Sequence, residues 1–374
     1  MPDIVVTITC DWEGEKLEAV DLTAMKILNQ KLVLFSKTLK QAIPITHFIC
    51  PAYFTRTDGE EARQNIAKDI LKSGAIKKED EIAAHVHCWK SLSLEAGVDA
   101  ANFKIGPIGV NPNSQPAFVH GTKQYAQDTG YTVPFGIYAK ADAVKFLNTT
   151  VTLIGKYLGQ SPVSFRSGMW VTCDVIFEAL AETPLRNEAS GIPFNYMNTT
   201  VRGFAGDKNL VNWNVKIWGN AKTIDTDPQY VQNHKSFAQY SSGILGMGDQ
   251  QISEPKSVSG IVEVPDTGTL IPITNQSLMN KHIDRAFEIA EQTDQDVYIS
   301  LGFHQEDCGQ PAFFNIGTDP LTKEEKEVRL NGLVGAIAHL ISKSIGKKFP
   351  VEFIKKDDLP SLMARGKKFA IPTA

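Results

Sequence analysis

The sequence lacks a long uninterrupted apolar run, and this argues against one class of protein. The longest late apolar stretch, at 330–341, is interrupted by His339 and is shorter than the roughly 20 residues that a membrane-spanning helix needs. The first residues also lack the basic segment of a secretory signal, because Asp3 stands there and the apolar run ends at Asp11. We therefore expect a cytoplasmic protein without stable membrane insertion.

Cysteine and net charge are also scarce. Five cysteines, an odd number without clustered spacing, argue against a disulfide framework and agree with a reducing compartment. The net charge of −4 is too small to indicate a nucleic-acid partner. With 42% hydrophobic and 21% charged residues, the 374-residue chain has the composition of a globular protein.

Segments typical of strands and helices alternate along the chain. We expect strands at 4–12, 44–54, 81–89, 162–170, 260–268, 296–307 and 351–356, and helices at 18–39, 60–75, 140–159, 171–182, 278–293 and 323–344. Such alternation is typical of a parallel sheet covered by helices. The pattern is interrupted at about 97–136 and 186–256, which we interpret as two irregular insertions. The sequence therefore predicts one α/β barrel domain over residues 1–374.

Ionisable side chains follow four of the predicted strands, where an α/β barrel gathers its chemistry. These side chains are Asp11 and Glu13, His85 and His87, Arg166, and His304 and Glu306. Side chains two apart in a strand share a face, so each pair is expected to point the same way. One H-x-H pair alone is more often structural, but several converging carboxylates and imidazoles are the ligands that Zn²⁺ requires.

Three cysteines lie beside these motifs and offer a rival ligand set. By the same alternation, Cys10 faces away from Asp11, and Cys88 faces away from His85 and His87. We therefore interpret these cysteines, together with Cys308, as small packing residues behind the site.

Five motifs in order resemble the polysaccharide deacetylase superfamily, carbohydrate esterase family 4, in a divergent form like that of exopolysaccharide gene clusters. The motifs are VTITCDWEG, IPITHFICPAYF, EIAAHVHCW, SFRSGMW and LGFHQED. The resemblance covers nearly the whole chain outside the two insertions. It implies a distorted (β/α)7-type barrel that hydrolyses an amide with the help of a metal ion. The amide is usually the N-acetyl group of a sugar.

The resemblance also implies roles for single residues. Asp11 matches the general base, and Arg166 matches the residue that orients the carboxylate at the end of the first strand. His304 matches the general acid that protonates the leaving amine, and His85 matches a metal ligand. These roles predict a small-molecule or glycan substrate.

Two departures from the family pattern change the expected ligand set. Trp12 stands where the family has a second aspartate, and Trp89 stands where it has a second histidine, four residues after the first. Glu13 and His87 are the nearest substitutes. The predicted ligands are therefore Glu13, His85 and His87, holding one divalent metal, zinc first, with cobalt or nickel as alternatives.

Aromatic and acidic residues near the motifs are candidates for substrate contact. We assign this role to Trp89, Trp213 and Glu306, since tryptophan rings stack on sugar faces. For Trp213 an ordinary place in the core remains an equal alternative.

Three other functions remain open. The same site would serve a non-sugar amide such as a ureide or cyclic imide, and a degenerate barrel would bind glycan without cleaving it. A glycoside hydrolase would use paired carboxylates such as Glu13 and Glu263. We rank that reading last, because it leaves Arg166, His85 and His304 without a role.

Overall fold

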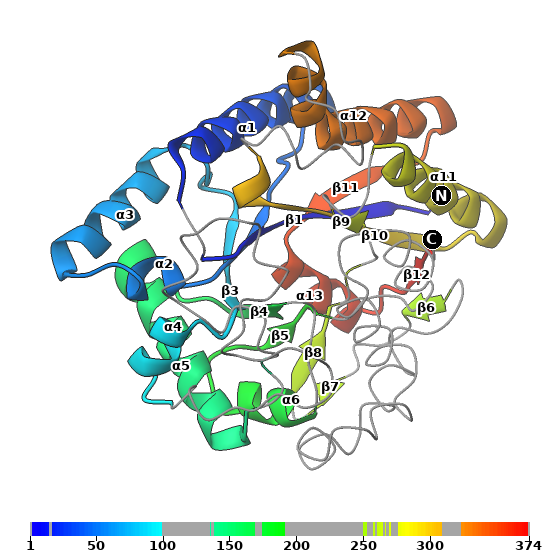
Figure 1. Cartoon of the computed structure of the whole chain (residues 1–374). Helices are drawn as coiled ribbons and strands as arrows, with labels where there is room; N and C mark the ends of the chain where they lie inside the picture. The colour runs from blue at the N-terminus through cyan, green and yellow to red at the C-terminus, as the bar shows by residue number, and fades with distance from the viewer. Residues whose placement is uncertain are drawn as a thin grey trace, which may run out of the picture.

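A curled sheet of mostly parallel strands forms the centre of the protein, with helices on its outer side (Figure 1). The computed structural model describes residues 2–14, 17–98, 135, 138–168, 174–190, 250–252, 257–258, 260–264, 266, 269–270, 276–308 and 323–372. Within these residues the strand order is β6-β12-β10-β1-β2-β3-β4-β5-β8-β7, with β11 paired to β1 and β9 paired to β10. The chain thus has the α/β barrel-like fold that the sequence predicts.

The strands and helices have the following bounds. The strands are β1 (Ile4–Trp12), β2 (Thr46–Ile49), β3 (Glu81–Val86), β4 (Ser164–Ser167), β5 (Asn187–Glu188), β6 (Gln250–Ile252), β7 (Ser257–Val258), β8 (Ile261–Glu263), β9 (Thr269–Leu270), β10 (Asp296–His304), β11 (Val351–Ile354) and β12 (Phe369–Ile371). The helices are α1 (Ala19–Leu39), α2 (Ala52–Thr55), α3 (Glu60–Lys72), α4 (Lys90–Glu95), α5 (Lys140–Leu158), α6 (Asp174–Ala181), α11 (Gln276–Thr293), α12 (Lys323–Lys347) and α13 (Leu359–Ala364), with 3-10 turns η6 (Gln305–Asp307) and η7 (Lys356–Asp358).

The first strand, β1, lies in the middle of the sheet. One of its edges pairs with β10 along nearly its whole length, while the other pairs first with β11 and then with β2. All three pairings are parallel, so the carboxyl ends of neighbouring strands meet at one edge of the sheet. The register sets Asp11 opposite His304 and His85 opposite Arg166.

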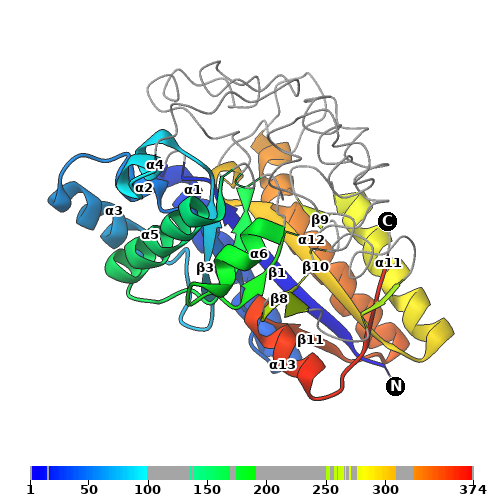
Figure 2. The same ribbon diagram turned by 90° about the horizontal axis from the view of Figure 1, so that it is seen from below.

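The two faces of β1 have different compositions, as its alternating side chains require. Ile4, Val6 and Ile8 belong to the hydrophobic core that the sheet shares with the outer helices. Thr7 and Thr9 lie on the opposite face and are also fully buried. Figure 2 shows α11 and α12 on the outer side of β1 and β10, where the two helices pack against each other. From Thr7 onward the inner face of β1 is therefore polar, and it leads to the site.

Most predicted elements are present, with differences at their ends. α5 ends at Leu158 and is capped by Gly159, the residue at which its end is predicted, where a φ of 73° suits glycine. The strand predicted at 296–307 stops at His304, because η6 begins at the next residue. The strand predicted at 81–89 likewise stops at Val86. Face alternation therefore does not extend to Glu306 or to His87.

The two predicted insertions lie mostly outside the described residues. Within the second range, however, β5 and β6 pair with other strands of the sheet. Cys10 and Cys88 are fully buried in the hydrophobic core.

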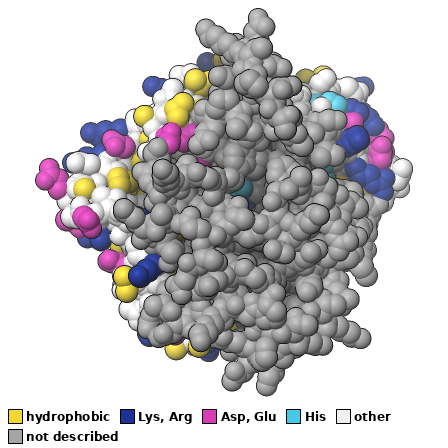
Figure 3. All heavy atoms as spheres, in the orientation of Figure 1, with side chains coloured by type: hydrophobic (Ala, Val, Ile, Leu, Met, Phe, Trp, Pro, Cys, Tyr) yellow, Lys and Arg dark blue, Asp and Glu magenta, His cyan; other side chains and the backbone are white. Residues whose placement is uncertain are grey.

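Charged side chains of both signs are interspersed on the face shown in Figure 3, over α3 and near α11. Ion pairs such as Lys347 with Glu291 and Arg285 with Glu288 accompany this mixture. Among the described residues, no helix has the length and apolarity to cross a membrane.

Candidate metal centre

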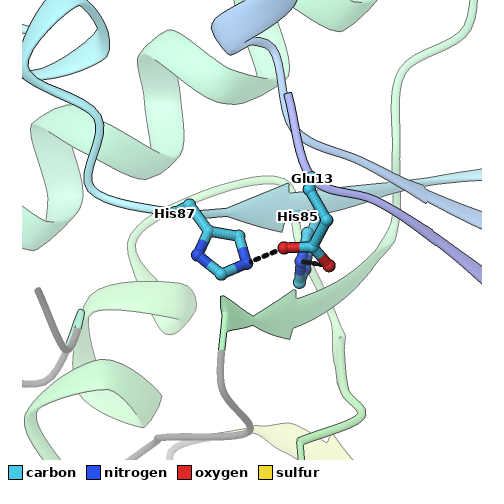
Figure 4. A group of neighbouring side chains, drawn as sticks. All are labelled: Glu13, His85 and His87. Carbon is cyan, nitrogen blue, oxygen red and sulfur yellow. Dashed lines mark ion pairs between the residues drawn. The ribbon is translucent and has the colours of Figure 1, made fainter. Parts of the chain in front are cut away.

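The carboxylate of Glu13 lies among three imidazole rings (Figure 4 shows two of them). Its Oε2 lies 2.5 Å from His87 Nε2, and its Oε1 lies 3.1 Å from His304 Nε2 and 3.6 Å from His85 Nε2. Glu13 follows β1, the two histidines of Figure 4 belong to β3 and the residues just after it, and His304 ends β10. The structure thus brings together the carboxylate and the imidazoles that the sequence assigns to the site.

The orientation of the His85 ring is set by its other nitrogen. His85 Nδ1 lies 2.9 Å from the backbone carbonyl of Arg166. A carbonyl only accepts hydrogen bonds, so Nδ1 carries a proton, and in the neutral ring Nε2 then carries the lone pair. His85 Nε2 is buried and has no hydrogen-bond partner among the residues that the structure describes. This is the arrangement in which histidine binds a metal ion.

The His87 ring is positioned by the backbone of Gly168, just after β4. A Cβ atom at residue 168 would lie only 2.6–2.7 Å from three atoms of the His87 ring. Glycine is therefore the residue that lets the ring occupy this position. His85 and His87 stand nearly perpendicular, with ring centroids 4.9 Å apart.

The surroundings of Glu13 keep its carboxyl group ionised. Burial by itself raises the pKa of Glu13, but the charges of His87 and His304 and a hydrogen bond from His304 outweigh it. The pKa of Glu13 is therefore held well below its usual value. A buried carboxylate beside imidazole rings is a set of donors suited to a divalent cation.

Arg166 links three strand ends beneath Glu13. Its Nη1 donates to Asp11 Oδ1 at 2.7 Å, and its Nη2 donates to Asp266 Oδ2 at 2.9 Å. Its Nε donates to the carbonyl of Ala189 at 3.0 Å, and its guanidinium lies 4.2 Å from the ring centre of Phe48. Burial opposes the charged form, but the two carboxylates raise the pKa of Arg166. Arg166 thus fixes the position of the Asp11 carboxylate.

Two residues, Glu306 and Trp89, hold the backbone of Glu13 in place. Glu306 Oε1 accepts a hydrogen bond from the backbone N–H of Glu13 at 2.9 Å and another from the hydroxyl of Tyr53. Trp89 Nε1 donates to the backbone carbonyl of Glu13 at 3.0 Å, and its ring lies under the guanidinium of Arg56. Trp89 is fully buried, so the substrate contact predicted for it requires its neighbours to move. The substrate contacts of Trp89 and Glu306 stay predictions, and Trp213 lies outside the described residues.

Trp12, at the usual place of a second aspartate, lies on the opposite face of β1 from the site. Its Nε1 donates to His47 Nδ1 at 3.1 Å, and His47 Nε2 lies 3.2 Å from Asp80 Oδ2. A neutral His47 with its proton on Nε2 satisfies both partners. The hydrogen bonds of Trp12 and His47 are thus made within the core.

Two residues of the centre were missed by sequence reasoning. Asp266 is fully buried against Arg166, and Tyr53 contacts Glu306. Asp266 closely follows strand β8, as the other ionisable residues follow their strands, but the sequence pattern of this segment indicates only a strand. Tyr53 lies in a short helix that was predicted as the end of a strand, and no signal in the sequence marked it.

These residues fit a divalent metal ion. Glu13, His85 and His87 offer ligand atoms that all lie within 4.8 Å of one another, and so do Asp11, Glu13 and His304. The lone pair of His85 Nε2 is the clearest sign, since a buried polar atom without a partner is otherwise costly.

Comparison with known proteins gives matches only among solved structures. No family model matches the chain, and no curated protein matches it. A Mycobacterium smegmatis protein described as a polysaccharide deacetylase aligns with 97% of this chain and 91% of its own, at 12% identity and a TM-score of 0.44. A family 4 acetyl xylan esterase from Clostridium thermocellum, solved with a cobalt ion, aligns with 96% of this chain and 91% of its own, at 12% identity and a TM-score of 0.33.

Both proteins are of the kind that the sequence motifs resemble. A 4-alpha-glucanotransferase from Thermococcus litoralis also matches over 96% of this chain and 40% of its own, at 10% identity and a TM-score of 0.41. At such values the matches do not decide between the chemistry of a deacetylase and that of a glucanotransferase. The choice between the two depends on the residues of the site.

Proposed function

We propose that the protein is a metal-dependent hydrolase that removes an N-acetyl group from a sugar or glycan precursor. The metal ligands in this proposal are Glu13, His85 and His87. The observation that carries it is the buried His85 Nε2, whose lone pair points into the centre without a hydrogen-bond partner among the described residues. A glycoside hydrolase or a scaffold gives no reason for such an atom.

Zinc is the first choice of metal, because imidazole nitrogen and carboxylate oxygen are its common ligands in catalytic sites, with cobalt or nickel as alternatives. When bound, such an ion polarises a carbonyl group and lowers the pKa of water to roughly 7. Glu13 is ionised and buried, so it enters the site ready to serve as a ligand.

The chain's own residues supply the proton transfers. Asp11, held by Arg166, accepts the proton of the attacking water. His304 donates a proton to the leaving nitrogen. Its side chain is 21% exposed, against 2% for the His85 and His87 side chains, and is therefore the imidazole that substrate reaches most easily.

The N-acetyl sugar is preferred over a ureide or cyclic imide on the sequence motifs, since the centre itself suits either amide. The cytoplasmic location expected from the sequence stays a prediction. In that compartment the substrate would be a sugar precursor rather than an exported polymer.

Metal content tests the proposal first. Elemental analysis of untagged protein is expected to give about one zinc, cobalt or nickel ion per chain, because the three ligands form one catalytic-type site. His87→Ala removes a ligand, so its metal content should fall close to zero. His339→Ala is the matched control, since His339 pairs with Asp284 on the outer helices.

Activity is tested next with acetate release from N-acetylated sugar precursors, beside hydrolysis of small cyclic amides. Turnover of the sugars that His87→Ala abolishes supports the proposal. A wild-type protein that takes up no metal, even after incubation with Zn²⁺, contradicts it.

A further inference from the structure

Glu13 belongs to two ligand groups and not to one. The first group is Glu13, His85 and His87, and the second is Asp11, Glu13 and His304. Within each group the ligand atoms lie within 4.8 Å of one another. His304 does not join the first group, although it lies 3.1 Å from Glu13. One metal ion in the first group therefore leaves a second set of three ligand atoms beside it.

We propose that Asp11, Glu13 and His304 bind a second divalent cation, more weakly than the first group, and that this cation inhibits the enzyme. The inference rests on the proposed function, which assigns the metal of the first group. The ligands of the second group are two carboxylates and one imidazole, a set that Zn²⁺ accepts.

The two oxygens of Glu13 face different imidazole rings. Oε2 lies against His87, while Oε1 lies closer to His304 than to His85. Asp11 contributes to the second group because the hydrogen bond from Arg166 uses its Oδ1 and leaves Oδ2 for another partner. A carboxylate whose two oxygens face different imidazole rings would offer a ligand atom to each group.

Electrostatic repulsion should make the second group bind a cation more weakly than the first group does. The Arg166 guanidinium lies 2.7 Å from Asp11 and repels a cation there. The charge of Glu13 is shared with the ion of the first group, and that ion repels a second one. His304 is also more exposed than His85 or His87, so a cation held by it exchanges more readily with solvent.

Inhibition is expected because two ligands of the second group, Asp11 and His304, also carry out the proton transfers. In the proposed function Asp11 accepts a proton and His304 donates one. A cation that occupies the lone pairs of both groups blocks both proton transfers. Turnover should therefore rise with the first equivalent of metal and fall when excess metal is added.

Calorimetric titration of the metal-free, untagged chain with Zn²⁺ tests the inference without any substrate. We expect two phases and two ions per chain, the second binding at least about tenfold more weakly because of charge repulsion. His304→Ala should keep the strong phase and lose the weak one, and Asp11→Asn provides a second variant with the same expectation. His339→Ala should keep both phases, since this histidine is remote from the centre.

The outcomes separate the two proposals. A single strong phase in the wild type overturns the second site and leaves the proposed function intact. A weak phase that persists in both His304→Ala and Asp11→Asn overturns the ligand assignment. No binding at all overturns the proposed function as well. Circular dichroism of each variant checks that a lost phase is not a lost fold.

Discussion

At the scale of single residues, the ability of the centre to bind a metal ion depends on the partners of the two ring nitrogens of His85. His85 Nδ1 meets the Arg166 carbonyl and His85 Nε2 meets the centre, so the protein backbone decides which nitrogen carries the lone pair. Backbone partners of this kind orient metal ligands and raise their affinity. Gly168 acts on His87 in a comparable way, through the space that its missing side chain leaves.

We predict that Gly168→Ala weakens metal binding. The added methyl group would lie 2.6–2.7 Å from ring atoms of His87, so the ring has to move away from Glu13. Zn²⁺ affinity, measured by competition with a chelating dye, should fall about tenfold or more, as for other supports of metal ligands. Gly346→Ala is the control, because among the described residues no atom outside its own helix backbone and its two chain neighbours lies within 4 Å of the added methyl group. Equal affinities in the two variants would contradict this role of Gly168.

At the scale of elements, Arg166 joins the ends of separate strands. It ends β4 and bonds to Asp11 of β1 and to Asp266, which follows β8. A fully buried guanidinium is tolerated only when its charge and its donors are matched. The two carboxylates therefore hold the strand ends together as well as shaping the site.

We predict that Asp266→Asn destabilises the fold. The amide keeps an acceptor but removes one of the two negative charges on Arg166, and we expect a loss of roughly 1–3 kcal/mol in the free energy of unfolding. Urea denaturation measures it. Asp284→Asn, which breaks a partly exposed pair with His339 and Lys343, should cost less than about 1 kcal/mol. If Asp266→Asn lowers the free energy of unfolding by no more than Asp284→Asn does, the structural role of Asp266 is refuted.

The elements also show what the sequence could and could not predict. β1 was predicted with its observed bounds, because a long β-branched run ending in charge allows few alternatives. The end of β10 was missed, since nothing in the local pattern separates a strand from the 3-10 turn that follows His304. Asp266 was missed for a different reason. Its partner is 100 residues away in the chain, and the contact depends on parallel pairing of β4, β5 and β8.

At the scale of the whole molecule, polar side chains fill much of the inside of the barrel. Lys356 is fully buried, and its Nζ donates to the hydroxyl of Tyr298 at 2.8 Å; that hydroxyl lies 2.9 Å from Thr7 Oγ1. At the opposite end of β3 from the site, Glu81 is buried and accepts a hydrogen bond from Thr46. The stability of the protein should depend on pH, because the pKa of Glu81 is raised to about 7.

The raised pKa of Glu81 determines whether the free energy of unfolding rises or falls with pH. Burial, and then the nearby charge of Asp357, raise the pKa of Glu81 from 4.5 to about 7. Between these two values the folded protein binds a proton that the unfolded chain has released. The free energy of unfolding therefore falls as the pH rises from 4.5 to about 7, and the loss is complete above that. A rise in pKa of this size corresponds to roughly 3 kcal/mol at most.

We predict that Glu81→Gln removes this part of the pH dependence, because glutamine stays neutral and still accepts the hydrogen bond from Thr46. Urea midpoints between pH 5 and pH 8 should fall with pH in the wild type and change much less in the variant. Glu352→Gln, at an exposed position of β11, should behave as the wild type does. Parallel pH profiles for the wild type and Glu81→Gln would mean that Asp357, whose pKa is also raised by burial, carries the proton in the folded state.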